Sequence, residues 1–456
     1  MVKKNEDLKQ NKSEKKSKLI KKIVIGCIAV IVLELIIMLG TYIYRENKID
    51  YIDGLNDIQE IKNGYIAVGY SNFRNSATIS KKTYTHTVPE TGEKENVIAN
   101  QARIAKYDSD MELIWEQTFP CEYDSTYYNV LAVEDGYIAV GSYVYDYEQI
   151  DLNVRDGLIV KYDLDGKILW HKNYQVLGDT EFFNVIESDG NYIVIGQSIY
   201  ENMEIGNHIS GGGIILKYNK DGELLAKNNY GGNKSGVFND IVEVEDGYIL
   251  CGRDAANYGV VVKFKKDFDR DPKDYDVITK KVEWSRSYSN TDEAGFTKLA
   301  IKDDKIYLSG AVNVSNQKDS EGNPIYKYDA GIVVYNTSGK YLNKYTFGGS
   351  NNDRYNSMYF NEDNIIAIGV TMSKDIDIPD YPKYETKTGI IVKYDLNGKI
   401  LEKTYFGGEK EDIFTRIIKV DDKYLVVGTT NSERGLFGND YQPIMNTYDE
   451  NLKKVN

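Results

Sequence analysis

Acidic and amide side chains recur in short turns that lead into strand-like segments. Glu181, Asp353 and Asp412 each stand two positions before an aromatic residue, and the turns around the last two add Asn351, Asn352 and Glu409. Carboxylate and amide groups in such turns suit the binding of a cation, a sugar or a basic peptide. The alternative is structural, because an Asp in a turn accepts hydrogen bonds from nearby backbone N–H groups. The sequence leaves both interpretations open.

Motifs typical of catalysis or metal binding are scarce. The three histidines lie far apart, and no HExxH, GxSxG, P-loop or Cys-x-x-Cys motif occurs. Asp267, Asp269 and Asp271 have the spacing of a calcium-binding loop, but Pro272 replaces the glycine that such a loop requires. We therefore predict neither a metal ion nor a cofactor. We favour a non-catalytic role, since paired carboxylates occur on any acidic surface.

The elements that must position these side chains are repeated seven times. The stretch "DNIIAIGVT" at 363–371 has counterparts, and their glycines are Gly69, Gly141, Gly196, Gly252, Gly310, Gly369 and Gly428. Around them lie short runs of alternating apolar residues separated by turn residues, four to a complete unit, as in an antiparallel sheet. A sheet of this size leaves its faces bare, and a ring of sheets covers them. The repeat predicts an all-β fold, a seven-bladed β-propeller of four-stranded antiparallel blades.

One large residue in each unit is expected to anchor the first strand in the core. These residues are Leu55, Tyr128, Phe183, Phe238, Phe296, Tyr355 and Phe414. The third strand of each unit ends at an aromatic residue, and hairpin turns such as "DLDG" and "DLNG" follow it. The fourth strand of the last unit does not fit before residue 456, so we expect residues 44–51 to supply it.

The segment "FGGSNNDRYNSMYFNEDNIIAIGVTMS" at 347–373 resembles the seven-bladed β-propeller repeat of bacterial surface proteins. The resemblance rests on a Gly-Gly-Ser turn, an acidic residue, an aliphatic strand and a strand that ends in Gly-x-Thr. It is good in the last two repeats and degenerate elsewhere, as in "LGD" at 177–179. A weaker resemblance links "KYDLDGKILW" at 161–170 to quinoprotein-type propellers. These resemblances imply a fold for about residues 50–450 and no particular activity.

The connections between strands indicate which end of the predicted ring carries the function. The spacing from the second-strand glycine to the third-strand aromatic varies widely between repeats, whereas the spacing from first to second strand is nearly constant. Variable loops on a rigid scaffold are where binding sites usually occur. In an antiparallel blade these loops emerge at the same end as the acidic turns. We call this end the loop face; the alternative is that its loops vary without a function.

The first 44 residues predict a membrane anchor. Residues 1–22 carry nine Lys and three acidic residues, and residues 23–44 are almost uninterruptedly apolar. As a helix the apolar stretch would be about 33 Å long, enough to span a bilayer, with Tyr42 and Tyr44 at an interface. The Lys cluster predicts a basic cytoplasmic tail over 1–22, a transmembrane helix over 23–44 and an extracytoplasmic propeller over 45–456. A cleaved signal peptide is the alternative.

Charge narrows the possible partners. The chain has a formal net charge of −14, which disfavours binding to nucleic acid. Glu34 lies within the predicted span, where it either contacts a partner helix or is simply tolerated. The sequence thus predicts a cell-membrane protein whose propeller binds or scaffolds an extracytoplasmic protein or glycan. The alternative is a hydrolase or lyase that acts on surface polysaccharide through its loop carboxylates.

Overall fold

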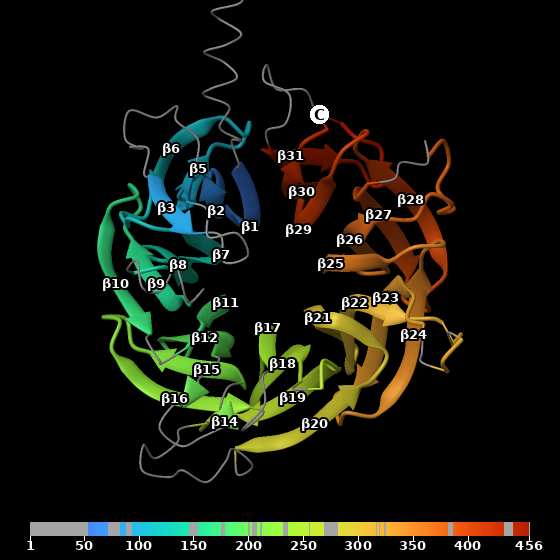
Figure 1. Cartoon of the computed structure of the whole chain (residues 1–456), viewed down its shortest axis with the longest axis horizontal. Helices are drawn as coiled ribbons and strands as arrows, with labels where there is room; N and C mark the ends of the chain where they lie inside the picture. Colours follow the sequence, from blue (N-terminus) through green and yellow to red (C-terminus); the bar gives the residue numbers. More distant parts are fainter. Residues whose placement is uncertain are drawn as a thin grey trace, which may run out of the picture. The chain divides into compact units, whose positions relative to one another are not determined.

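The structure is a computed structural model. It describes residues 53–71, 83–87, 94–145, 154–174, 178–198, 201–202, 208–209, 212–230, 236–254, 256–268, 281–315, 317–318, 320–322, 325–381, 386–432 and 441–455. Seven of the β-sheets that these residues form are arranged in a ring (Figure 1), which confirms the predicted seven-bladed propeller. The predicted anchor at 23–44 lies outside the described residues. Within the part of the chain that the structure describes, no helix is long and apolar enough to cross a membrane.

Strands occupy the same four places in successive blades. The first strands, nearest the centre in Figure 1, are β1 (Asp53–Ile61), β7 (Ser125–Val133), β11 (Thr180–Ser188), β17 (Val237–Val244), β21 (Thr291–Lys302), β25 (Asp353–Phe360) and β29 (Asp412–Val420). The second strands are β2 (Gly64–Ser71), β8 (Gly136–Tyr143), β12 (Asn191–Ser198), β18 (Gly247–Arg253), β22 (Lys305–Asn313), β26 (Asn364–Thr371) and β30 (Lys423–Thr430). The third strands are β5 (Gln101–Tyr107), β9 (Asp156–Tyr162), β15 (Gly212–Tyr218), β19 (Gly259–Lys265), β23 (Tyr328–Asn336), β27 (Thr388–Asp395) and β31 (Gln442–Tyr448).

The outer edge of the ring is formed by the fourth strands. They are β6 (Leu113–Thr118), β10 (Ile168–Tyr174), β16 (Leu224–Tyr230), β20 (Val282–Tyr288), β24 (Tyr341–Phe347) and β28 (Ile400–Phe406). Two short hairpins lie in connections between second and third strands, namely β3 (Thr83–Thr87) with β4 (Lys94–Ile98) and β13 (Glu201–Asn202) with β14 (His208–Ile209). All strand pairs are antiparallel, and each blade is ordered first, second, third and, in six blades, fourth from the inside outward.

The last blade has three strands among the described residues. After β31 the chain turns back, so that Lys454 forms an isolated bridge with Tyr448 and the N–H of Val455 donates to the carbonyl of Thr447 (2.7 Å). The C-terminal residues therefore begin to occupy the place of the fourth strand. Residues 44–51, which were expected to fill it, lie outside the described residues.

Apolar side chains between neighbouring blades form the core. One cluster joins Ile195 and Ile215 of the third blade to Phe238 and Leu250 of the fourth. The many tyrosines fit such interfaces, because their rings pack in the apolar layer while their hydroxyl groups bond to one another. Tyr127 and Tyr162 illustrate this arrangement, with 2.7 Å between their hydroxyl oxygens.

Every first strand contains a β-bulge directly after its anchor residue. In the sixth blade the register shifts between Tyr355 and Ser357, so that Asn356 is the extra residue, and the other six blades show the equivalent shift. The bulge brings the backbone of the first strand close to that of the second. As a result, a Cβ atom on Gly369 would overlap the carbonyl oxygen of Arg354. Each of the seven repeated glycines faces such a carbonyl. The recurring glycine is thus required by close backbone contact.

The bulge also corrects the predicted anchors of two blades. Tyr127 and Phe182 are fully buried and pair with the second-strand glycines, whereas the predicted anchors Tyr128 and Phe183 are half-buried. The prediction was wrong by one residue in these blades, because two adjacent aromatic residues offer the same hydrophobicity and a bulge breaks the alternation. Glu181 therefore stands one position before its anchor and is not equivalent to Asp353.

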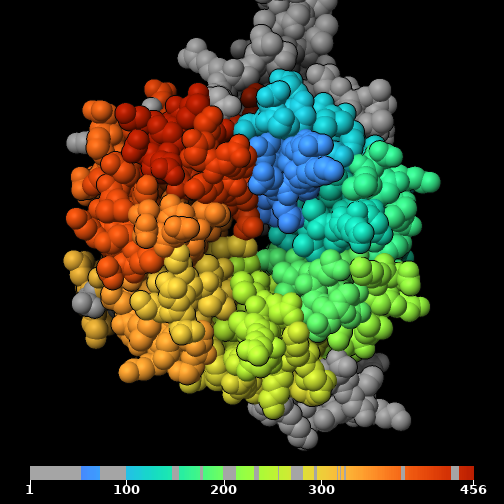
Figure 2. All heavy atoms as spheres, turned by 180° about the vertical axis from the view of Figure 1, so that it is seen from behind, coloured from blue at the N-terminus to red at the C-terminus, as the bar shows by residue number. Residues whose placement is uncertain are grey.

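Contacts between the first and last blades close the ring. The hydroxyl group of Thr415 donates to the carbonyl of Leu55 (2.8 Å), and the N–H of Asp53 donates to the carbonyl of Tyr441 (3.2 Å). The space-filling view shows the blades packed around a narrow central opening (Figure 2). The propeller is consequently a continuous ring with one central channel.

Candidate functional site

The carboxylates of Asp353 and Asp412 are held inside their own turns. Asp353 is 2 % exposed and accepts hydrogen bonds from the N–H of Gly349 (2.9 Å) and the hydroxyl groups of Thr371 and Ser373. Asp412 has equivalent donors in the N–H of Gly408 and the hydroxyl groups of Thr430 and Ser432. Burial raises the pKa of Asp353. The Gly-Gly turn and the Gly-x-Thr-x-Ser strand ends therefore form a structural unit around each carboxylate.

The other candidate residues of these turns lie at the surface. Asn351 and Asn352 are exposed and bond to backbone groups, for example from the Nδ2 atom of Asn351 to the carbonyl of Met372 (3.0 Å). Glu409 is also exposed. These residues belong to the turns before the sixth and seventh blades, and Glu181 belongs to the third blade. The structure thus distributes the six candidates over three blades.

Glu181 lies in a network of polar side chains. Its carboxylate accepts hydrogen bonds from the Nε2 atom of Gln197 (2.7 Å) and the hydroxyl group of Tyr128 (2.8 Å), and it pairs with the guanidinium of Arg155 (3.3 Å). Asp179 is close by, because its Oδ2 atom is 3.4 Å from the same Nε2 atom of Gln197. Burial and, secondly, the negative charge of Glu181 raise the pKa of Asp179 to about 6.

The extra residue of each bulge usually fastens one blade to the next. In five blades its side chain donates to the backbone carbonyl of the next blade's anchor at 2.7–2.9 Å, and these residues are Asn56, Asn239, Thr297, Asn356 and Thr415. The second and third blades carry Tyr128 and Phe183 at this position. Their rings pack against each other instead, with centroids 5.1 Å apart. The regular connection is therefore replaced by an aromatic pair on one side of the ring.

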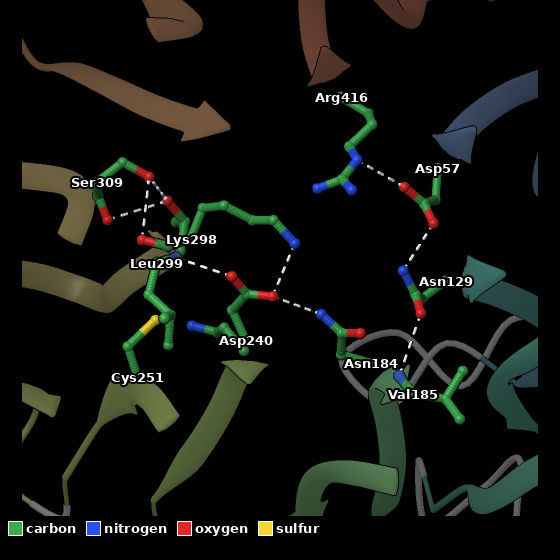
Figure 3. Close-up of polar contacts among 12 residues, drawn as sticks. Asp57, Asn129, Asn184, Val185, Asp240, Cys251, Lys298, Leu299, Ser309 and Arg416 are labelled. Carbon is green, nitrogen blue, oxygen red and sulfur yellow. Dashed lines mark hydrogen bonds and ion pairs between the residues drawn. The ribbon is translucent and has the colours of Figure 1, made fainter. Parts of the chain in front are cut away.

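One residue further along the first strands, polar side chains form what we call the polar belt (Figure 3). Its members are Asp57, Asn129, Asn184, Asp240, Lys298, Ser357 and Arg416. Figure 3 labels all of them except Ser357. Lys298 and Asn184 both donate to Asp240 (2.7 and 2.5 Å), while Asn129 and Arg416 contact Asp57 (2.6 and 3.0 Å). Both carboxylates of the polar belt are used in bonds between blades, so the polar belt primarily links neighbouring blades.

A cavity of about 560 Å³ opens at the loop-face end of the channel. This channel-mouth cavity is lined by Glu181, Phe183, Gln197, Val237, Asn239, Arg253, Thr297, Arg354 and Asn356. They come from the third to sixth blades and lie on the first strands or directly after the glycine of a second strand. A cavity of this size can hold a small ligand, and its guanidinium, amide and carboxylate groups can form oriented hydrogen bonds.

Of the candidate residues predicted from sequence, Glu181 lines the channel-mouth cavity. The two arginines, the amide side chains and Phe183 of this cavity were not identified from the sequence as possible ligand contacts. These residues have no recognisable motif, because they come from separate repeats. The available signal was variation within the repeat: the position before the anchor is Glu181 or Arg354 in two blades and Gly295 or Ile413 in others. No group of three potential metal ligands occurs in the described part of the chain.

In the comparison with known proteins, matches occur among solved structures. No known protein family and no curated protein sequence matches the chain. Among solved structures it is similar to the Pan2 WD40 domain of Neurospora crassa, at 10 % identity and a TM-score of 0.42, with 77 % of this chain and 86 % of that chain covered. It is also similar to the apocarotenoid oxygenase of Synechocystis (9 % identity, TM-score 0.38, 88 % and 90 % covered) and to a GH32 β-fructofuranosidase of Bombyx mori (8 %, 0.26, 87 % and 86 %). The predicted relation to bacterial surface proteins stays a prediction.

Proposed function

We propose that this chain is a membrane-anchored, extracytoplasmic β-propeller that binds a ligand in the channel-mouth cavity. One observation carries the proposal: in the third, fourth and sixth blades the positions around this cavity hold Glu181, Phe183, Gln197, Arg253 and Arg354. In the fifth and seventh blades the corresponding positions hold small, aliphatic or threonine residues, namely Gly295, Thr297, Ala311, Ile413, Thr415 and Thr429. Equivalent positions of the repeats have the same structural role. Their residue types are expected to differ most in blades where these positions have a second role, such as ligand binding.

Binding can be tested with the full-length chain in detergent. A glycan array and a peptide panel would identify a binder, and calorimetric titration would measure its affinity. Phe183→Asn gives the third blade the residue that three other blades use at this position, so we expect the fold to persist and the affinity to fall. Ser338→Ala, in an exposed hairpin turn at the opposite end of the ring, is the control. Unchanged affinity in Phe183→Asn would contradict binding in this cavity.

The proposed anchor needs a separate experiment. The chain should stay in the membrane fraction after alkaline extraction, and an antibody against the propeller should label intact cells. Deletion of residues 2–44 should release the protein from the membrane. Release of the intact chain by alkali, or labelling only after permeabilisation, would contradict the proposed topology.

A hydrolase or lyase is the second candidate, and the Asp179–Glu181 pair favours it. Two neighbouring carboxylates, one with its pKa raised to about 6, can divide the roles of general acid and base. Incubation with surface polysaccharides should then release reducing ends, and Asp179→Asn should abolish the release. The absence of products from a broad panel of polysaccharides would exclude this candidate.

A further inference from the structure

The two cations of the channel-mouth cavity stand at repeat positions where no other blade carries a cation. Arg253 directly follows the second-strand glycine, where the other blades carry Tyr70, Ser142, Gln197, Ala311, Val370 and Thr429. Arg354 directly precedes its anchor, where the neighbouring fifth and seventh blades carry Gly295 and Ile413. Two arginines thus line one cavity in a chain whose net charge is −14.

The carboxylate that lines the cavity is paired with an arginine other than Arg253. Glu181 is already paired with Arg155 and accepts bonds from Tyr128 and Gln197. Arg253 donates from its Nη1 atom to the neutral Oδ1 atom of Asn257 (2.8 Å), and within the described part of the chain no carboxylate lies within ion-pair distance of it. Its positive charge is therefore available to a ligand that enters the cavity.

Neighbouring amides orient both arginines. The Nε atom of Arg354 donates to the Oδ1 atom of Asn356 (3.2 Å), and Asn356 is itself fixed because its Nδ2 atom donates to the carbonyl of Phe414 (2.8 Å). Asn257 belongs to the tight turn 254–258, in which the side chain of Asp254 accepts bonds from two backbone N–H groups. Such preorganisation lowers the entropy cost of binding an anion.

The same cavity offers groups that suit a sugar ring. Phe183 lines it with a half-buried ring supported by Tyr128, and the side chains of Asn239 and Gln197 add polar groups to the lining. An aromatic face beside amides and arginines fits a small saccharide that also carries an acidic group, since guanidinium groups bind carboxylate and phosphate oxygens in pairs.

We infer that the channel-mouth cavity binds an anionic saccharide, with its carboxylate or phosphate group between Arg253 and Arg354 and a sugar ring against Phe183. The inference rests on the proposed function and specifies the ligand of that same site. A uronic acid and a sugar phosphate share this recognition chemistry. They differ in the charge and in the geometry of the acidic group.

The probes are glucuronate, glucose 6-phosphate and glucose, each titrated to about 10 mM against the full-length chain in detergent. We expect at least one of the two anionic sugars to bind about tenfold more tightly than glucose and to weaken as salt rises. Arg253→Gln should remove this preference, because the guanidinium is lost while the amide keeps the polarity. The matched control is Arg286→Gln on β20 of the same blade, whose Nε atom donates to the carbonyl of Gly339 outside the cavity.

The outcomes separate the inference from the proposed function. Preference for glucuronate would assign a uronic acid, and preference for glucose 6-phosphate a phosphorylated sugar. Binding of glucose as tight as that of both anions, unchanged in Arg253→Gln, would overturn the inference and leave ligand binding in the cavity intact. If neither anionic sugar binds, the inference fails, and the wider glycan and peptide screen decides whether the proposed function fails with it.

Discussion

The Oδ1 atom of Asp57, in the first strand of the first blade, lies 3.0 Å from the Nε atom of Arg416 in the first strand of the last blade (Figure 3). The other carboxylate oxygen accepts hydrogen bonds from the Nδ2 atom of Asn129 (2.6 Å) and the N–H of Val130 (3.1 Å) in the second blade. One buried carboxylate thus connects three blades across the point where the ring closes. The ring therefore depends on a contact between residues at opposite ends of the repeat array.

Asp57→Ala should weaken ring closure strongly. The substitution leaves the partly buried guanidinium of Arg416 and two amide donors without their acceptor, and we expect the free energy of unfolding to fall by about 3 kcal/mol. Chemical denaturation of the full-length chain measures the change. The control is Glu450→Ala, which removes a partner 3.9 Å from the Nζ atom of Lys419 at an exposed site. Equal stability of the two variants would contradict a closing role for Asp57.

The repeated glycine should not tolerate even one methyl group. A Cβ atom at Gly369 would overlap the carbonyl oxygen of Arg354, so Gly369→Ala should lower the free energy of unfolding by about 3 kcal/mol. Gly236→Ala is the matched control, because its Cβ atom would meet no atom closer than 3.3 Å. Thermal unfolding followed by circular dichroism compares them. A Gly369→Ala protein as stable as the control would show that the bulge yields easily.

The turn carboxylate of Asp353 should contribute to stability. Its carboxylate accepts from four donors, whereas the single oxygen of an Asn side chain serves at most two of them. Asp353→Asn should therefore reduce the free energy of unfolding by about 2 kcal/mol. Glu409→Gln, at an exposed position of the next turn, should change it by less than about 0.5 kcal/mol. If both variants denature like the wild type, the carboxylate is free for a role in binding.

Asp179 should make stability depend on pH. Its pKa is raised from 3.8 to about 6, first by burial and then by the charge of Glu181. The folded chain binds this proton more tightly than the unfolded chain, so protonated Asp179 raises the free energy of unfolding. This contribution is fully present below about pH 4 and is lost as pH rises through 6. Asp179→Asn should raise the free energy of unfolding at pH 7.5 by about 1 kcal/mol, allowing for solvent screening, and give no gain at pH 4.

The comparison for this prediction is Asp221→Asn, in an exposed turn of the same blade. Urea denaturation at the two pH values measures all three proteins. A gain of equal size at both pH values in Asp179→Asn would show that its effect does not come from ionisation.

Local signals fixed most of the blade. The turn "DLNG" is one example, because the side chain of Asp395 accepts bonds from the N–H groups of Asn397 and Lys399 (2.9 Å each), a geometry that neighbouring residues determine alone. Where two aromatic residues are adjacent, as in Phe182–Phe183, alternation could not decide which one is buried. The bulge decided it, and a bulge depends on packing against the next strand.

The candidate site, like the blade, was predicted only in part from local sequence. The sequence by itself determined seven units, their strand order and the end of the ring that carries the variable loops, because short-range periodicity and turn chemistry encode all three. Only the tertiary structure decided that Glu181, Arg253 and Arg354 share one cavity and that Asp353 is buried in its turn. The physical reason is that a ring brings equivalent positions of distant repeats together, whereas the local sequence records each position separately.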